Sequence, residues 1–239
     1  MPPLSMPQRP AASATRQRAE MSTVTISTRT EEVPCGTAAH DFLNTDLAQL
    51  RSVAQHATPA DIERALTRPR RDLRDFSALL SPTAGKRLEE IAQLAHATTV
   101  RRFGKTAHLF APLYLSNECV SVCTYCGFSA TNDVVRRTLS VEEVVLEAKE
   151  LVRRGFSHLL LVSGEHARIV SKGYVRECIE AIAAFVPQIS IEVQAWDTET
   201  YRSFVDAGCD GLVVYQETYD RTTYAAVHLK GKKRNYDWR

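Results

Sequence analysis

Two rhythms of apolar residues divide the sequence. From Thr58 to about Arg102, apolar side chains recur every three or four residues, as they do on one face of an amphipathic helix. Thr58 followed by Pro59 is a typical helix start, because the hydroxyl caps the helix and proline fits its first position. Three apolar stripes follow, over residues 62–66, 73–80 and 88–95. The sequence therefore predicts a helical lead-in over about residues 36–105.

After Gly104, short apolar runs alternate with amphipathic stretches. The runs predict strands over residues 108–115, 158–162, 189–193 and 211–215, although Pro112 weakens the first of them. The stretches between them predict helices over residues 141–154, 174–185 and 198–207. Strands that alternate with helices form right-handed βαβ units and a parallel sheet. We therefore expect an α/β fold for residues 106–239.

A complete (β/α)8 barrel of the TIM type takes about 250 residues. This chain ends soon after the fourth predicted strand. We expect about four βα units, which is the N-terminal half of a barrel. Because half a barrel leaves an open sheet edge, the sequence is expected to be truncated at its C-terminus.

The composition is that of an ordinary globular protein. Hydrophobic residues make up 44%, and 30 Lys and Arg face 28 Asp and Glu, for a net charge of +2. These values exclude wholesale disorder and do not indicate a nucleic-acid partner. Since no apolar run reaches about 18 residues, no membrane span is expected. Residues 1–35, proline-rich and basic near their start, are expected to form a disordered extension, with a transit peptide or a true start at Met21 as alternatives.

Three of the six cysteines crowd into one short stretch directly after the first predicted strand. Cys119, Cys123 and Cys126 have the spacing Cys-x3-Cys-x2-Cys. Three thiolates in one loop can each bind a different iron of a [4Fe–4S] cube, which leaves the fourth iron open for a substrate. A structural zinc site needs four ligands, and no second Cys/His pair is spaced to complete it. The pattern favours an open iron–sulfur cluster over zinc or inert thiols.

The same stretch, with Tyr125 before the third cysteine, resembles the signature of the radical S-adenosylmethionine superfamily. Several further phrases resemble its aromatic amino-acid lyase branch, and within it the tyrosine lyases of thiamine thiazole biosynthesis; they lie at residues 113–117, 126–129, 160–166, 214–219 and 228–233. The resemblance extends from about Thr58 to Arg239.

This resemblance implies a reaction and its cofactors. A [4Fe–4S] cluster on the three cysteines would bind S-adenosylmethionine and pass it one electron, releasing methionine and a 5′-deoxyadenosyl radical. That radical would take a hydrogen atom from L-tyrosine and become 5′-deoxyadenosine, and the tyrosine would break between Cα and Cβ to give 2-iminoacetate (dehydroglycine) and p-cresol. The resemblance also implies an electron donor such as flavodoxin or ferredoxin, a thiazole synthase as protein partner, and a cytoplasmic location. The alternatives are the tyrosine lyase of [FeFe]-hydrogenase maturation and an inactive cluster-binding fragment.

The resemblance also suggests cofactor contacts at the strand ends. Tyr125 would pack near the adenine. Ser163-Gly164-Glu165 stands where the superfamily has a Gly-Gly-Glu-like motif, and the Glu165 carboxylate would accept a hydrogen bond from the methionine ammonium group. Four further residues are candidates for ribose or substrate contacts, with helix capping as the alternative: Glu192, Gln194, Gln216 and Glu217. The sequence assigns no catalytic residue.

The remaining chemically distinctive residues have structural interpretations. Cys178 and Cys209 are expected to be small core residues, and Cys35 has no assigned place. A basic run at Lys230, Lys232, Lys233 and Arg234 lacks interleaved stacking aromatics. It is therefore expected to be a loop near the barrel mouth rather than a nucleic-acid site.

Overall fold

The structure, a computed structural model, describes residues 45–238. The predictions for residues 1–35, including Cys35, lie outside the described part. Two compact units are present, one extending to Gly104 and the other beginning at Lys105. No described helix is long and apolar enough to cross a membrane.

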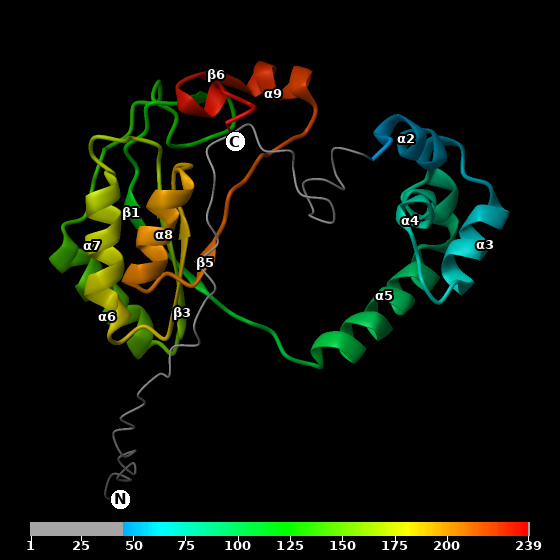
Figure 1. The fold of residues 1–239 in the computed structure, drawn as a ribbon, viewed down its shortest axis with the longest axis horizontal. Helices are drawn as coiled ribbons and strands as arrows, with labels where there is room; N and C mark the ends of the chain where they lie inside the picture. Colours follow the sequence, from blue (N-terminus) through cyan, green and yellow to red (C-terminus); the bar gives the residue numbers. More distant parts are fainter. Residues whose placement is uncertain (1–44, 239) are drawn as a thin grey trace, which may run out of the picture. The chain divides into compact units, whose positions relative to one another are not determined.

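The first unit consists of helices (Figure 1). Its elements are α2 (Leu47–His56), α3 (Pro59–Thr67), α4 (Leu73–Leu79), the 3-10 helix η1 (Pro82–Arg87) and α5 (Leu88–Phe103). The predicted start of α3 is confirmed, because the Thr58 side chain accepts a hydrogen bond from the Asp61 backbone and Asp61 caps Thr58 in return. A small apolar core holds the unit together, formed by Ala57, Ile62, Ala78 and Ala84.

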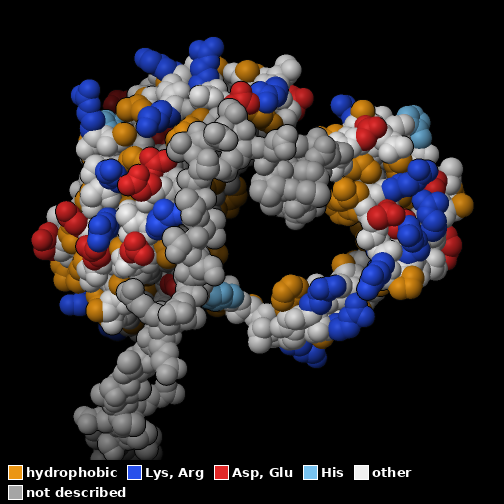
Figure 2. Space-filling model, in the orientation of Figure 1, with side chains coloured by type: hydrophobic (Ala, Val, Ile, Leu, Met, Phe, Trp, Pro, Cys, Tyr) orange, Lys and Arg blue, Asp and Glu red, His pale blue; other side chains and the backbone are white. Residues whose placement is uncertain are grey.

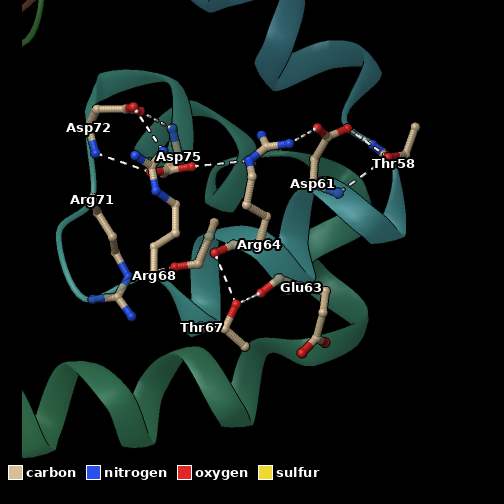
Figure 3. A network of polar contacts seen from close by, with 10 residues as sticks. Thr58, Asp61, Glu63, Arg64, Thr67, Arg68, Arg71, Asp72 and Asp75 are labelled. Atoms are coloured by element: carbon tan, nitrogen blue, oxygen red, sulfur yellow. Dashed lines mark hydrogen bonds and ion pairs between the residues drawn. The ribbon is translucent and has the colours of Figure 1, made fainter.

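An ion-pair network stabilises this helical unit beside its small core (Figure 3). Asp75 of α4 is fully buried. Its carboxylate accepts a hydrogen bond of 2.9 Å from Arg68 and lies 3.5 Å from Nε of Arg64. The Arg71 guanidinium donates to the carbonyl groups of Ala65 and Leu66 at the end of α3. These contacts tie the connection between α3 and α4 to both helices.

The second unit contains a parallel sheet with the strand order β1-β3-β4-β5. The strands are β1 (Ala111–Ser116), β3 (His158–Ser163), β4 (Gln188–Glu192) and β5 (Gly211–Leu212). Helices α6 (Val141–Arg153), α7 (Lys172–Ala183) and α8 (Thr198–Ala207) connect them and lie together on one face of the sheet (Figure 1). Pro112 is tolerated because β1 is an edge strand of the described sheet. The expected α/β architecture with parallel βα units is confirmed.

Apolar side chains of the strands and helices form one core. Leu159, Leu161, Ile189 and Ile191 project from the central strands into it and are almost completely buried. Cys178 on α7 and Cys209 before β5 are buried in the same cluster, as predicted.

Several predicted boundaries are wrong by two or three residues, three of them for simple reasons. β1 begins at Ala111 rather than at residue 108, because Ala111 pairs with Leu159 at the start of β3. β5 ends at Leu212 rather than at residue 215, because its partner β4 ends at Glu192. α7 begins two residues earlier than predicted, since the Ser171 hydroxyl caps it.

A smaller layer covers the carboxyl ends of the strands. Its two-stranded antiparallel sheet joins β2 (Val122–Cys123) to β6 (His228–Lys230). Helix α9 (Arg221–Val227) leads into β6, and the 3-10 helix η2 (Lys232–Arg234) follows it. The cysteine stretch is thereby paired with the C-terminal basic run.

Candidate functional site

The cysteine loop, residues 117–130, begins where β1 ends and is held by backbone hydrogen bonds from three directions. The Val120 N–H donates to the Glu165 carbonyl at 2.9 Å, the Thr124 N–H to the Val227 carbonyl at 3.0 Å, and the Ala130 N–H to the Ser121 carbonyl at 2.9 Å. The loop is therefore fixed to the residues after β3, to the end of α9 and to itself.

Arg136 fastens the outer turn of the same loop. Its guanidinium donates to the carbonyl groups of Asn117, Phe128 and Ser129 at 2.7, 2.9 and 2.8 Å. A planar guanidinium with five donors suits such a set of carbonyl oxygens. This role of Arg136 is not visible in the sequence, because it depends on how the loop folds back.

The three predicted ligand thiols all line one cavity of about 200 Å³. All three are free thiols; Cys123 is buried, while Cys119 and Cys126 are half-buried. Burial raises the pKa of the Cys123 thiol, and the positive charge of Lys233 opposes that rise. Among residues 45–238, no three His, Cys, Asp or Glu side chains are grouped to hold a single metal ion. A [4Fe–4S] cube does not need such a group, because each thiolate binds a different iron.

Strand ends supply most of the remaining predicted contacts. Gly164, Glu165, Glu192 and Glu217 line the same cavity as the thiols, together with Tyr125. Glu165 is mostly buried, and its carboxylate accepts a hydrogen bond of 3.3 Å from the Ser121 hydroxyl. The carboxyl ends of parallel strands thus bring three carboxylates to the cysteine loop.

Gln194 and Gln216 do not line this cavity. Gln194 is buried, and its Nε2 donates to the Val170 carbonyl at 2.9 Å while its Oε1 has no hydrogen-bond partner. The Gln216 amide lies 3.5 Å from the Tyr236 carbonyl. Their cofactor role stays a prediction with no support from the geometry.

Gly164 allows the end of β3 to approach the cysteine loop. A Cβ atom at this position would lie 2.3 Å from the Glu118 carbonyl oxygen and 3.1 Å from Cβ of Cys119. The Gly164 N–H also donates to the Ser116 carbonyl at 3.0 Å. Glycine is needed here because any side chain would occupy the space of the loop backbone.

Glu217 and Lys233 form an ion pair on the cavity wall. Nζ of Lys233 lies 2.7 Å from Oε1 of Glu217. Burial raises the pKa of the Glu217 carboxyl, but the hydrogen bond and charge of Lys233, together with the hydrogen bond from Tyr125 and the charge of His228, lower it below its usual value, so the carboxylate is ionised at neutral pH. The Glu217 backbone has φ = 74°, a left-handed conformation that is strained for a residue other than glycine.

Tyr125 is held by a histidine 103 positions along the chain. The Tyr125 hydroxyl lies 2.6 Å from Nε2 of the fully buried His228. Nδ1 of His228 donates to the Tyr224 carbonyl at 2.9 Å, and the Tyr125 hydroxyl also hydrogen-bonds to the Glu217 carboxylate. Burial raises the pKa of Tyr125, and its phenol therefore keeps the proton that it donates.

Several cavity residues escaped the sequence analysis. Ser121, Phe128, Tyr215 and Lys233 all line it. In the sequence, Lys233 stands out only as part of a basic run, and its pairing with Glu217 cannot be inferred from spacing.

Comparison with known proteins identifies the class. The profile of the Radical SAM superfamily matches residues 113–239, and the chain belongs to this superfamily. It is 44% identical to 2-iminoacetate synthase of Escherichia coli (strain K12) and 45% identical to that of Salmonella typhimurium (strain LT2). Each match extends over 182 residues, 76% of this chain and 48% of the relative. The chain thus spans about half the length of these curated relatives.

Solved structures share the fold. The crystal structure of HydG, a maturase of the [FeFe]-hydrogenase, matches with a TM-score of 0.75 and 29% identity, over 83% of this chain and 46% of that one. Methylornithine synthase (PylB) matches with a TM-score of 0.61 at 23% identity, over 72% of this chain and 52% of that one, and shows the fold alone. The expected superfamily and barrel-type fold are confirmed.

Radical SAM proteins use a [4Fe–4S] cluster and S-adenosylmethionine. The residues present fit both groups. Three free thiols from one loop reach a single cavity, and carboxylates from the strand ends line its wall. Thiolates are the ligands of such clusters, and carboxylates suit an ammonium group and hydroxyl groups.

Proposed function

We propose that this chain carries the cofactor site of a radical lyase that cleaves L-tyrosine to 2-iminoacetate and p-cresol. The observation that carries the proposal is that three thiols and three strand-end carboxylates line one cavity, in a chain 44% identical to a 2-iminoacetate synthase. When bound, the cluster and S-adenosylmethionine supply the one-electron chemistry that removes a hydrogen atom from the substrate.

The chain's own residues would bind the cluster, orient S-adenosylmethionine and shield the reacting atoms from water. Cys119, Cys123 and Cys126 would hold the cluster. The Glu165 carboxylate, fixed by Ser121, would accept a hydrogen bond from the methionine ammonium group. Tyr125 would pack against the adenine from its anchored position.

The opposite wall of the cavity would complete the cofactor site. Glu192 and Glu217 would accept hydrogen bonds from ribose hydroxyls. Apolar side chains would exclude water from the reacting atoms; they are Phe128, Val162, Val193 and Val213.

We take the biological role of the chain from its similarity to the 2-iminoacetate synthases. Thiamine thiazole biosynthesis, a thiazole synthase partner, a flavodoxin or ferredoxin donor and a cytoplasmic location belong to this proposal. The structural likeness to HydG favours [FeFe]-hydrogenase maturation as a second candidate. We rank it below because its identity is 29%, against 44% for the first.

The test is anaerobic reconstitution with iron and sulfide, followed by reduction and EPR spectroscopy. We expect a [4Fe–4S]⁺ signal that shifts when S-adenosylmethionine is added, and p-cresol when L-tyrosine follows. Cys123→Ser should lose the cluster, while Cys178→Ala, which changes a buried core thiol on α7, should keep it. A wild-type chain without any cluster would refute the proposal. A cluster and cofactor shift without p-cresol would leave an inactive cluster-binding fragment.

A further inference from the structure

The basic run at the C-terminus forms a strap, residues 228–234, with two different faces. Its inner face belongs to the site, because His228 holds Tyr125 and Lys233 holds Glu217. Its outer face is exposed and consists of Leu229, Lys230, Lys232 and Arg234. The same short segment therefore connects the cavity with the surface.

The strap lies directly on the cysteine loop. In the β2–β6 pair, Val122 is opposite Lys230 and Cys123 is opposite His228. A Cβ atom on Gly231 would lie 2.6 Å from Cα of Ser121, so the two backbones touch there. Since neighbouring strands are separated by about 4.8 Å, the surface cations are one strand away from the ligand loop.

The outer face carries charge that is not neutralised. Among residues 45–238, Lys230, Lys232 and Arg234 form no ion pair, whereas the inner Lys233 is paired with Glu217. Figure 2 shows Lys and Arg side chains along the edge of the unit where Figure 1 has β6. Leu229 is 48% exposed among these cations, and the neighbouring Val120 is 42% exposed. Apolar side chains ringed by one sign of charge are typical of a surface for a transient, oppositely charged partner.

We propose that the outer face of the strap docks an acidic one-electron carrier protein that reduces the cluster. This inference rests on the proposed function, which requires a source of electrons. One electron would pass from the hydroquinone form of a flavin carrier to the [4Fe–4S]²⁺ cluster, giving the semiquinone and [4Fe–4S]⁺; no bond forms between the proteins. The hydrogen bond from the Thr124 N–H to the carbonyl of Val227, the residue directly before the strap, supplies a short bonded path from the strap to the residue beside Cys123.

The test measures the reduction rate of the reconstituted cluster by photoreduced flavodoxin. We expect Lys230→Glu/Arg234→Glu to slow this reduction at least about tenfold at low ionic strength, and the wild-type rate to fall with added salt. Reduction by dithionite and the EPR shift with S-adenosylmethionine should stay unchanged, because neither residue lines the cavity.

Lys149→Glu/Arg202→Glu is the matched control. It changes the net charge by the same amount but alters exposed cations of α6 and α8. An equal slowing in the control, or no slowing in the strap variant, would overturn the docking proposal. So would strap-dependent binding of a single-stranded oligonucleotide, or strap-dependent dimers in sedimentation, with an unchanged flavodoxin rate. Failure of the proposed function would be seen in a different measurement, because the wild-type chain would then assemble no cluster at all.

Discussion

Replacing Gly164 with alanine should damage the cysteine loop although the change adds only one methyl group. The new Cβ would lie 2.3 Å from the carbonyl oxygen and 2.9 Å from the carbonyl carbon of Glu118. Both atoms are backbone, so no flexible side chain can move aside. Because the Gly164 N–H is bonded to the Ser116 carbonyl, the strand end cannot withdraw without breaking that contact.

The size of the effect follows from this overlap. Forcing an extra methyl group into a packed region costs roughly 1–3 kcal/mol. For a chain of this length, a loss of ~2 kcal/mol corresponds to a decrease in Tm of about 4–8 °C. The loop rather than the sheet should absorb the displacement, since β3 is paired on both sides. We therefore expect the position of Cys119 to change and cluster binding to weaken.

Iron content after anaerobic reconstitution and thermal unfolding of the apo-protein measure the two effects. Gly127→Ala is the matched control, because Gly127 also belongs to the cysteine loop but a Cβ there meets nothing within 4 Å. It should bind iron like the wild type and change stability by less than about 1 kcal/mol. The reasoning is refuted if Gly164→Ala retains full iron content and Tm, or if Gly127→Ala loses as much.

Three further changes test other parts of the structure. Asp75→Ala should lower the free energy of unfolding in urea by roughly 2–3 kcal/mol. The change removes the buried carboxylate that pairs with Arg64 and Arg68, and it leaves these two positive charges without their partner. The pKa of Asp61 is lowered to about 2, chiefly by the hydrogen bond from the Thr58 side chain. A lowered pKa means that its stabilisation is complete above about pH 4 and lost as the pH falls toward 2, so Asp61→Asn should weaken the pH dependence of unfolding in that range. Tyr125→Phe should cost ~1 kcal/mol in the wild type and less than that in a His228→Phe background, where only the hydrogen bond to Glu217 is left to lose, as a double-mutant cycle would show.

Local signals predicted the elements well. The Thr58-Pro59 pair predicted the start of α3, and the structure shows that the Ser140–Glu143 capping box of α6 and the left-handed Gly208 after α8 are short-range features of the same kind. The cysteine spacing likewise predicted a loop at the mouth of the sheet, since parallel strands carry functional loops at their carboxyl ends. These inferences need only the order of residues along the chain.

The tertiary partners of the site were not predictable in this way. His228 reaches Tyr125 only because β6 pairs with β2, a long-range pairing of two very short strands that leave almost no pattern in the sequence. The basic run at Lys233 and its neighbours predicted a loop near the barrel mouth, but not which of its cations faces the cavity. Alternation along the strap turns Lys233 inward to Glu217 and leaves Lys230 outside. One basic run thus serves both the cavity and the surface, and only the pairing of its backbone with the cysteine loop separates these two roles.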